Sequence, residues 1–107
     1  MTQKHLARGA ILGRMGPIIE AVLRRYELER EALDKPGRAI KAICEARWVC
    51  YWIAHELELP LSDTEIAVVF GQGPTAARLG AIRIAKQRAR DTWLRENTDA
   101  LLAELRA

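Results

Sequence analysis

The stretch from residue 38 to residue 58 constrains the fold most, because it is apolar on almost every side of a helix. At helical spacing, one stripe comprises Ile40, Ile43, Arg47, Cys50, Ile53, Ala54 and Leu57. This stripe is widened by Trp48, Val49, Tyr51 and Trp52. A helix of this kind has to be covered on several sides, so we predict that it is the central helix of a bundle. A tryptophan-rich run can also stack on a cofactor or on bases, but this spacing favours core packing.

The composition of the whole chain is typical of helices. Ala, Leu, Arg and Glu are abundant, and only 6% of the residues are aromatic. A length of 107 residues is that of one domain. We therefore predict an all-α fold, a small helical bundle in a single domain. Its expected parts are an N-terminal helical extension (1–37), a core (38–94) and a C-terminal helix (95–107).

Proline and capping residues indicate where the outer helices begin and end. Pro17 suits the first turn of a helix that continues to about Leu33. Near the C-terminus, an amphipathic stretch from Asp99 to Leu105 either continues the preceding helix or forms a last helix, for which Asn97–Asp99 is a candidate start. A homodimer is compatible with the apolar positions Ile18, Val22, Leu101 and Leu105.

A short helix is predicted directly after the central one. Pro60 breaks the chain, and Ser62 and Glu65 have the spacing of a capping box. In such a box the serine hydroxyl accepts from the glutamate amide while the carboxylate reaches back. The short helix would then run from about residue 63 to Phe70.

A turn and a longer helix are predicted to follow. Gly71 and Gly73 tolerate the backbone of a tight turn, and Pro74 suits the first position of a helix. The helix would extend from Thr75 to about Trp93 or Leu94. Two short helices joined by a glycine-containing turn are typical of a helix-turn-helix, in which the second helix enters the major groove of DNA. We place this motif over roughly residues 62–90.

The charge distribution supports this interpretation more than the net charge of +3 does. No acidic residue occurs between Glu65 and Asp91, whereas that window holds Arg78, Arg83, Lys86, Arg88 and Arg90. An ordinary solvated helix face is the alternative, but the absence of any compensating acid favours contact with DNA.

The predicted second helix can be divided into two faces. The expected core face consists of Ala77, Ala81, Ile82, Ile84, Ala85 and Ala89. The expected outer face consists of Ala76, Leu79, Gly80, Arg83, Gln87 and Arg90, with Lys86 alongside and Arg78 at its edge. Small residues allow close approach and contact with thymine methyl groups, whereas Arg83 and Gln87 can donate to base edges or phosphates.

The predicted DNA-binding residues extend beyond this helix. The full set is Thr75, Ala76, Arg78, Leu79, Arg83, Lys86, Gln87, Arg90, Gln72, Ser62, Arg47, Lys41 and Arg38. The last three lie in the first half of the 38–58 stretch and are candidates for phosphate contacts. Ordinary surface charge is an equally good interpretation of these three.

Residues 47–57 and 62–71 carry a resemblance to a known family. Arg47, the segment Ala54–Leu57, and Ser62–Phe70 with Gly71 after it are similar to the C-terminal DNA-binding domain of the bacterial replication initiator DnaA. The similarity covers about residues 38–88 and implies a Trp-repressor-like helical fold that binds double-stranded DNA.

The chain departs from that family at the residues that read its DNA site. The family continues with a Gly-Arg-Asp-His-Thr-Thr sequence, whereas this chain has Gln72–Ala77. With a gap, Thr75 matches the first threonine, but the Asp-His pair is absent. The phosphate-binding loop of the initiator's ATPase is missing too, so the chain is not expected to be a complete initiator.

The residues give no support to an enzymatic function. His55 and Glu56 lack the second histidine of a zinc-protease helix, His5 lies near the N-terminus, and no nucleophile and base can be paired. Cys44 and Cys50 would point to different faces of one helix and are interpreted as small core residues, which favours a reducing cytoplasm. We expect no enzymatic activity, no metal and no cofactor. No run approaches the ~18 apolar residues of a membrane span.

Together these features predict a small bacterial, phage or prophage transcriptional regulator that binds double-stranded DNA in the cytoplasm, associated with the nucleoid. The bacterial or phage setting is what the resemblance implies. The alternative is a protein-interaction module with a repurposed helix-turn-helix, which docks on RNA polymerase, a replication initiator or another regulator. In this chain Pro74–Ala77 stand in place of polar residues that would read DNA, and this difference motivates the alternative.

Overall fold

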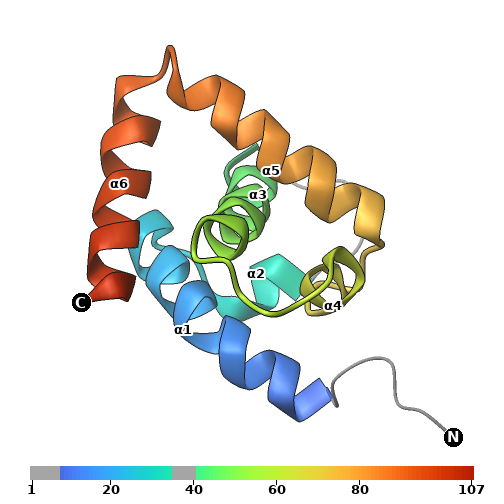
Figure 1. Ribbon diagram of the computed structural model, residues 1–107. Helices are drawn as coiled ribbons and strands as arrows, with labels where there is room; N and C mark the ends of the chain where they lie inside the picture. The colour runs from blue at the N-terminus through green and yellow to red at the C-terminus, as the bar shows by residue number, and fades with distance from the viewer. Residues whose placement is uncertain (1–7, 35–40) are drawn as a thin grey trace, which may run out of the picture.

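The computed structural model describes residues 8–34 and 41–107. Within these ranges the chain is helical, without strands, which confirms the all-α prediction (Figure 1). The helices are α1 (Arg8–Tyr26), α2 (Arg30–Asp34), α3 (Lys41–Glu56), α4 (Asp63–Val68), α5 (Pro74–Arg88) and α6 (Thr92–Arg106). Across the described residues, none of these helices combines the length and the apolar character needed to cross a membrane.

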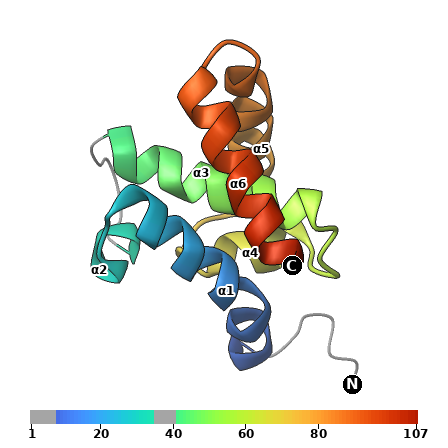
Figure 2. The same ribbon diagram turned by 90° about the vertical axis from the view of Figure 1, so that its left-hand side faces the viewer.

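Helix α3 is the centre of the bundle, as its apolar circumference predicts. It packs against each of the other described helices, and most closely against α5. Its fully buried side chains come from several faces and include Val49, Cys50, Tyr51 and Ile53. Figures 1 and 2 show α3 running between α1 below and α5 above. The tryptophan-rich run belongs largely to this core, with Trp52 buried and Trp48 half-buried.

The N-terminal region differs from the single helix that Pro17 suggested. Pro17 lies inside α1, not at its start, and α1 ends at Tyr26 instead of continuing to Leu33. A proline inside a helix forfeits one backbone hydrogen bond, and here the turns on both sides of it are held by buried apolar residues such as Met15 and Ile18. Packing therefore outweighs the local preference of proline.

Helix α1 ends in a left-handed residue. Glu27 has φ of 54°, and the amide of Leu28 donates to the carbonyl of Leu23 over 3.0 Å. This is the hydrogen bond of a Schellman motif, which terminates the helix. Leu28 then packs against the core, and the chain begins the separate short helix α2.

The ends of α3 and α4 follow the same pattern. Glu58 has φ of 53° and Leu59 donates to Ala54, while Gly71 has φ of 69° and Gln72 donates to Ala67. Of the three left-handed residues Glu27, Glu58 and Gly71, only Gly71 is a glycine, the residue that tolerates the left-handed region without strain. The sequence therefore marks the turn after α4 more clearly than the other two.

Local signals set the start of α4 and α5 as predicted. Ser62 Oγ accepts from the Glu65 amide at 3.1 Å, and Glu65 Oε1 accepts from the Ser62 amide at 2.8 Å, which confirms the capping box. Pro74 occupies the first turn of α5, after Gly73 as the residue that precedes the helix. The side chains of His55 and Asp63 lie 2.8 Å apart and join the end of α3 to the start of α4.

The boundary between α5 and α6 lies earlier than the sequence suggested. Helix α5 ends at Arg88, and α6 starts after Asp91, whose Oδ1 accepts from the Leu94 amide at 3.0 Å. The expected start at Asn97–Asp99 is wrong, because Thr98 is buried inside α6 and donates to the Leu94 carbonyl at 2.7 Å.

Helix α6 packs on α1, as Figure 2 shows. Ile18, Val22 and Leu101 are buried in the core of the same chain, and Leu105 is partly buried against that core. These are the residues that the sequence offered for a homodimer. Since the chain itself covers them, the structure does not support a dimer through this surface.

Candidate nucleic-acid interface

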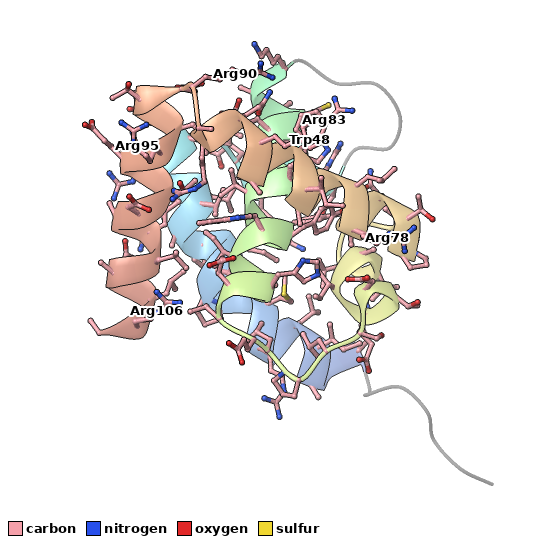
Figure 3. All side chains as sticks on the ribbon, turned by 45° about the horizontal axis from the view of Figure 1, so that its top comes forward. Trp48, Arg78, Arg83, Arg90, Arg95 and Arg106 are labelled. Atoms are coloured by element: carbon pink, nitrogen blue, oxygen red, sulfur yellow. The ribbon has the colours of Figure 1, made fainter. Side chains whose placement is uncertain are left out.

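Four cations of the acid-free window are exposed along α5 and just after it: Arg78, Arg83, Lys86 and Arg90. Figure 3 shows Arg78, Arg83 and Arg90 distributed from one end of α5 to the other. The sequence contributes no acidic residue anywhere from 66 to 90. The exposed cations of α5 therefore have no acidic residue within their own segment to offset their charge.

The fifth cation of the window points elsewhere. Arg88 Nη1 lies 2.8 Å from Asp99 Oδ1 and 3.2 Å from the Arg95 carbonyl, and it also donates to Thr98 Oγ1. Its guanidinium stacks on the Trp52 ring at 4.6 Å. Arg88 thus holds α6 against α5 and α3. Sequence reasoning missed this role because the partners come from a helix whose start was misplaced.

The buried face of α5 is rotated from the predicted one. The residues that face α3 are Ala77, Gly80, Ala81 and Ile84, whereas Ala85 and Ala89 are exposed and Ile82 is 44% exposed. Gly80, predicted to lie outside, is packed so closely that an added Cβ would lie 2.6 Å from Trp48 Cδ1. At this position Trp48 and Tyr51 of α3 leave no room for a side chain, so the glycine faces inward while Ile82 faces outward.

We call the exposed residues on the far side the α5 outer face; it comprises Thr75, Arg78, Leu79, Ile82, Arg83, Lys86 and Arg90. Leu79 is 52% exposed. At 3.6 residues per turn, Thr75, Leu79, Ile82 and Lys86 form its central row. A shallow hollow of about 410 Å³ runs along one edge and is lined by Leu79, Ile82, Arg83, Lys86, Gln87 and Arg90.

Arg83 is positioned by the central helix. Its guanidinium carbon lies 4.6 Å from the centre of the Trp48 ring, in cation–π geometry. Trp48 is half-buried, so one part of the indole packs under α5 while another part supports the arginine. Figure 3 shows the two labelled residues side by side.

Two predicted site residues on α5 are less accessible than the cations. Ala76 and Gln87 are both half-buried at the border with the core. The Oε1 atom of Gln87 is buried and has no hydrogen-bond partner among the described residues. Gln87 also lines the hollow, so this residue places a polar side chain at the border between the hollow and the core.

Gln72 and Ser62 have structural partners. Gln72 Oε1 accepts a hydrogen bond from the Tyr51 hydroxyl at 2.6 Å, which ties the turn to α3. Burial raises the pKa of Tyr51 far above its ordinary value, so this hydroxyl remains a donor. Ser62 is exposed, but its hydroxyl and its amide both belong to the capping box. Both residues therefore fix the geometry of α4 and the turn.

The three cations of the central helix region have different positions. Arg47 is only 3% exposed, and its Nε donates to the Leu33 carbonyl at 2.9 Å. The expected phosphate contact by Arg47 is therefore wrong, because α2 covers this side chain. Lys41 is exposed at the start of α3, and Arg38 lies outside the described residues.

Among residues 8–34 and 41–107 no three His, Cys, Asp or Glu side chains are grouped as they would be to hold a metal ion. Burial raises the pKa of the Cys50 thiol to about 12, which leaves it protonated. His5 lies outside the described residues.

Over the described residues, the fold is an all-helical bundle in which α5 carries an exposed cationic face. No known protein-family model matches the chain, and no curated protein has a significant sequence match to it. The function is therefore inferred from the charge and the exposure of the α5 outer face.

Proposed function

We propose that this chain binds double-stranded DNA through the α5 outer face, with α4 and α5 acting as a helix-turn-helix. The observation that carries the proposal is the exposure of Arg78, Arg83, Lys86 and Arg90 along one helix, in a window without acidic residues. The resemblance to the DNA-binding domain of DnaA agrees with it, and suggests a small bacterial or phage transcriptional regulator.

The dimensions of α5 suit the major groove. Its 15 residues span about 22 Å, and the groove is about 12 Å wide, which admits one α-helix. With α5 in the groove, Arg78 and Arg90 lie near opposite ends and can reach phosphates, while Arg83 is held closer to the centre. Each phosphate contact releases counterions, so affinity should fall steeply with salt.

The target sequence should differ from that of the initiator family. The Asp-His pair of that family is replaced here by the turn residues that precede Pro74. In this chain the turn contains Gln72, which accepts a hydrogen bond from the Tyr51 hydroxyl and so holds the turn against α3. We therefore expect the side chains of α5 to recognise the DNA sequence.

The test begins with selection of bound duplexes from a random pool at physiological salt. The selected duplex is then titrated with the variant Arg78→Ala/Arg83→Ala at several salt concentrations. We expect binding to weaken by about 2 kcal/mol or more, and the salt slope to decrease by roughly one to two. An unchanged slope would contradict the proposal.

A matched control removes the same charge elsewhere. Arg8 and Arg14 are exposed on the first half of α1, which Figures 1 and 2 place on the opposite side of the bundle from α5. The variant Arg8→Ala/Arg14→Ala should bind the duplex nearly as the unaltered chain does. Equal losses in both double variants would show a nonspecific charge effect.

A second candidate function is a protein-interaction module that docks on RNA polymerase, an initiator or another regulator. The exposure of Leu79 and Ile82 favours it, since exposed aliphatic residues also occur at protein interfaces. A stoichiometric protein partner, with duplex affinity no better than the nonspecific ~10⁻⁴ to 10⁻⁶ M, would support this function instead.

A further inference from the structure

The α5 outer face contains two large aliphatic side chains that the core does not use. Leu79 and Ile82 are 52% and 44% exposed, and the other large exposed hydrophobic among the described residues, Trp93, packs edge-on against Tyr26. Placing aliphatic surface in water is unfavourable. Both side chains lie on α5, among the exposed cations of the α5 outer face.

The two aliphatic side chains are neighbours within a cationic surround. They are three residues apart, which puts them on the same side of α5 with a rise of about 4.5 Å between them. The hollow that they line is shared with Arg83, Lys86 and Arg90. Any ligand that covers Leu79 and Ile82 must therefore present apolar groups beside negative charge.

In duplex DNA, one group meets this requirement at the base edges. The 5-methyl group of thymine is the apolar group that the major groove displays, and phosphates flank it on both strands. The spacing of Leu79 and Ile82 is comparable with the ~3.4 Å rise between successive base pairs. An aliphatic pair on a helix can thus contact methyl groups on adjacent or nearby pairs.

We infer that Leu79 and Ile82 select for thymine by packing against its 5-methyl groups. This inference rests on the proposed function. It differs from the sequence-based expectation, in which Ile82 belonged to the core and small residues made the methyl contacts. The reorientation of α5 by Gly80 is what brings Ile82 to the surface beside Leu79.

A protein partner fits the same surface less well. Protein interfaces are depleted of lysine and enriched in aromatic residues, methionine and arginine. Here Lys86 shares the hollow with the two aliphatic residues, and no aromatic residue or methionine among the described residues lines it. The apolar area is also limited to these two side chains.

The decisive experiment replaces thymine by deoxyuridine in the selected duplex, one position at a time and at all positions together. This change removes methyl groups while the charge and the base-edge hydrogen bonds stay the same. We expect about fourfold weaker binding for each contacted methyl group. Replacement of thymine in the flanking sequence should have no effect.

Variants of the protein identify the residues involved. In Leu79→Ala and Ile82→Ala, we expect affinity for the thymine duplex to fall while affinity for the uridine duplex changes little. Each variant should lose its sensitivity to one particular methyl group. Both side chains are exposed, and circular dichroism should show unaltered helix content.

Three results would overturn the inference. Sequence-specific binding that is indifferent to complete replacement by deoxyuridine would refute methyl contacts but leave DNA binding intact. If the unaltered protein bound no duplex at all, both the inference and the proposed function would be refuted. A protein partner whose binding is abolished by Leu79→Ala, without any effect of thymine in the duplex, would assign the surface to that partner.

Discussion

The guanidinium of Arg83 on α5 lies 4.6 Å from the centre of the Trp48 ring on α3. This contact links the exposed helix to the central one at the middle of the α5 outer face. A long cationic side chain loses conformational entropy when it binds a ligand. Because the indole already restrains Arg83, less of that entropy remains to be lost on binding.

Replacement of Trp48 by leucine should release Arg83. Protons above an aromatic ring shift upfield in NMR spectra, so the Arg83 side-chain signals should move towards ordinary values in Trp48→Leu. If the proposed function holds, duplex affinity should also fall by about two- to fivefold.

The conservative variant Trp48→Phe keeps a ring with a weaker cation–π attraction and should show an intermediate effect. In a background with Arg83→Ala, the Trp48 variants should have little further effect on affinity. Equal losses with and without Arg83 would show that Trp48 acts only through folding.

The variant Gly80→Ala should reduce stability despite the higher helix propensity of alanine. The new Cβ would lie 2.6 Å from Trp48 Cδ1 and 3.0 Å from Tyr51 Cδ2, so α5 or the rings must shift. Overpacking of this kind costs about 1–3 kcal/mol, against a gain of about 1 kcal/mol in propensity. Urea denaturation should therefore show a net loss of roughly 1 kcal/mol.

Gly13→Ala is the matched control for this substitution. Gly13 lies inside α1 with nothing within 4 Å of an added Cβ, so the same change there should stabilise by about 0.5–1 kcal/mol. Opposite signs at the two glycines are the expected result. A stabilising effect at both positions would contradict the tight contact between α3 and α5.

Local chemistry predicts much of this fold. The capping box of Ser62 and Glu65, the glycine at Gly71 and the proline at Pro74 are short-range signals whose partners lie within a few residues. Each acts through the nearby backbone, so the sequence shows it directly. The apolar circumference of the central helix is also visible in the sequence, although it acts by requiring other helices to cover it.

The remaining features depend on distant partners. Arg47 resembles a surface cation in the sequence, but a carbonyl of α2 satisfies it in the interior. Ile82 resembles a core residue, but the rings beneath Gly80 decide which side of α5 faces inward. The sequence therefore identifies Leu79 and the cations of the α5 outer face, whereas the exposure of Ile82 follows only from packing.

Cys50 should make stability decrease at alkaline pH. Burial raises the pKa of its thiol from an ordinary value of 9.0 to about 12 in the folded chain. A folded-state pKa above the unfolded one gives a contribution that is complete below pH ~9 and declines towards pH ~12. Near pH ~10.5 this decline amounts to about 2 kcal/mol.

The comparison with Cys50→Ala isolates this effect from other alkaline groups. Urea denaturation of both proteins at pH ~7.5 and ~10.5 should show that the variant loses less stability between the two pH values. The variant is expected to be less stable at pH ~7.5, because it leaves a small cavity. Equal losses in the two proteins would mean that the thiol is accessible to solvent.

Arg88 should matter for folding and little for DNA. Its guanidinium joins α5 to Thr98 and Asp99 of α6 while it stacks on Trp52 of α3. Arg88→Ala should therefore lower the free energy of unfolding by about 2–3 kcal/mol, because it removes several charge-assisted hydrogen bonds and leaves Thr98 without this donor. Urea denaturation measures this loss.

The neighbouring exposed cation gives the control, since Lys86→Ala should change stability by less than ~0.5 kcal/mol but weaken duplex binding. If Arg88→Ala weakened binding and left stability unchanged, Arg88 would belong to the α5 outer face instead of the joint between the helices.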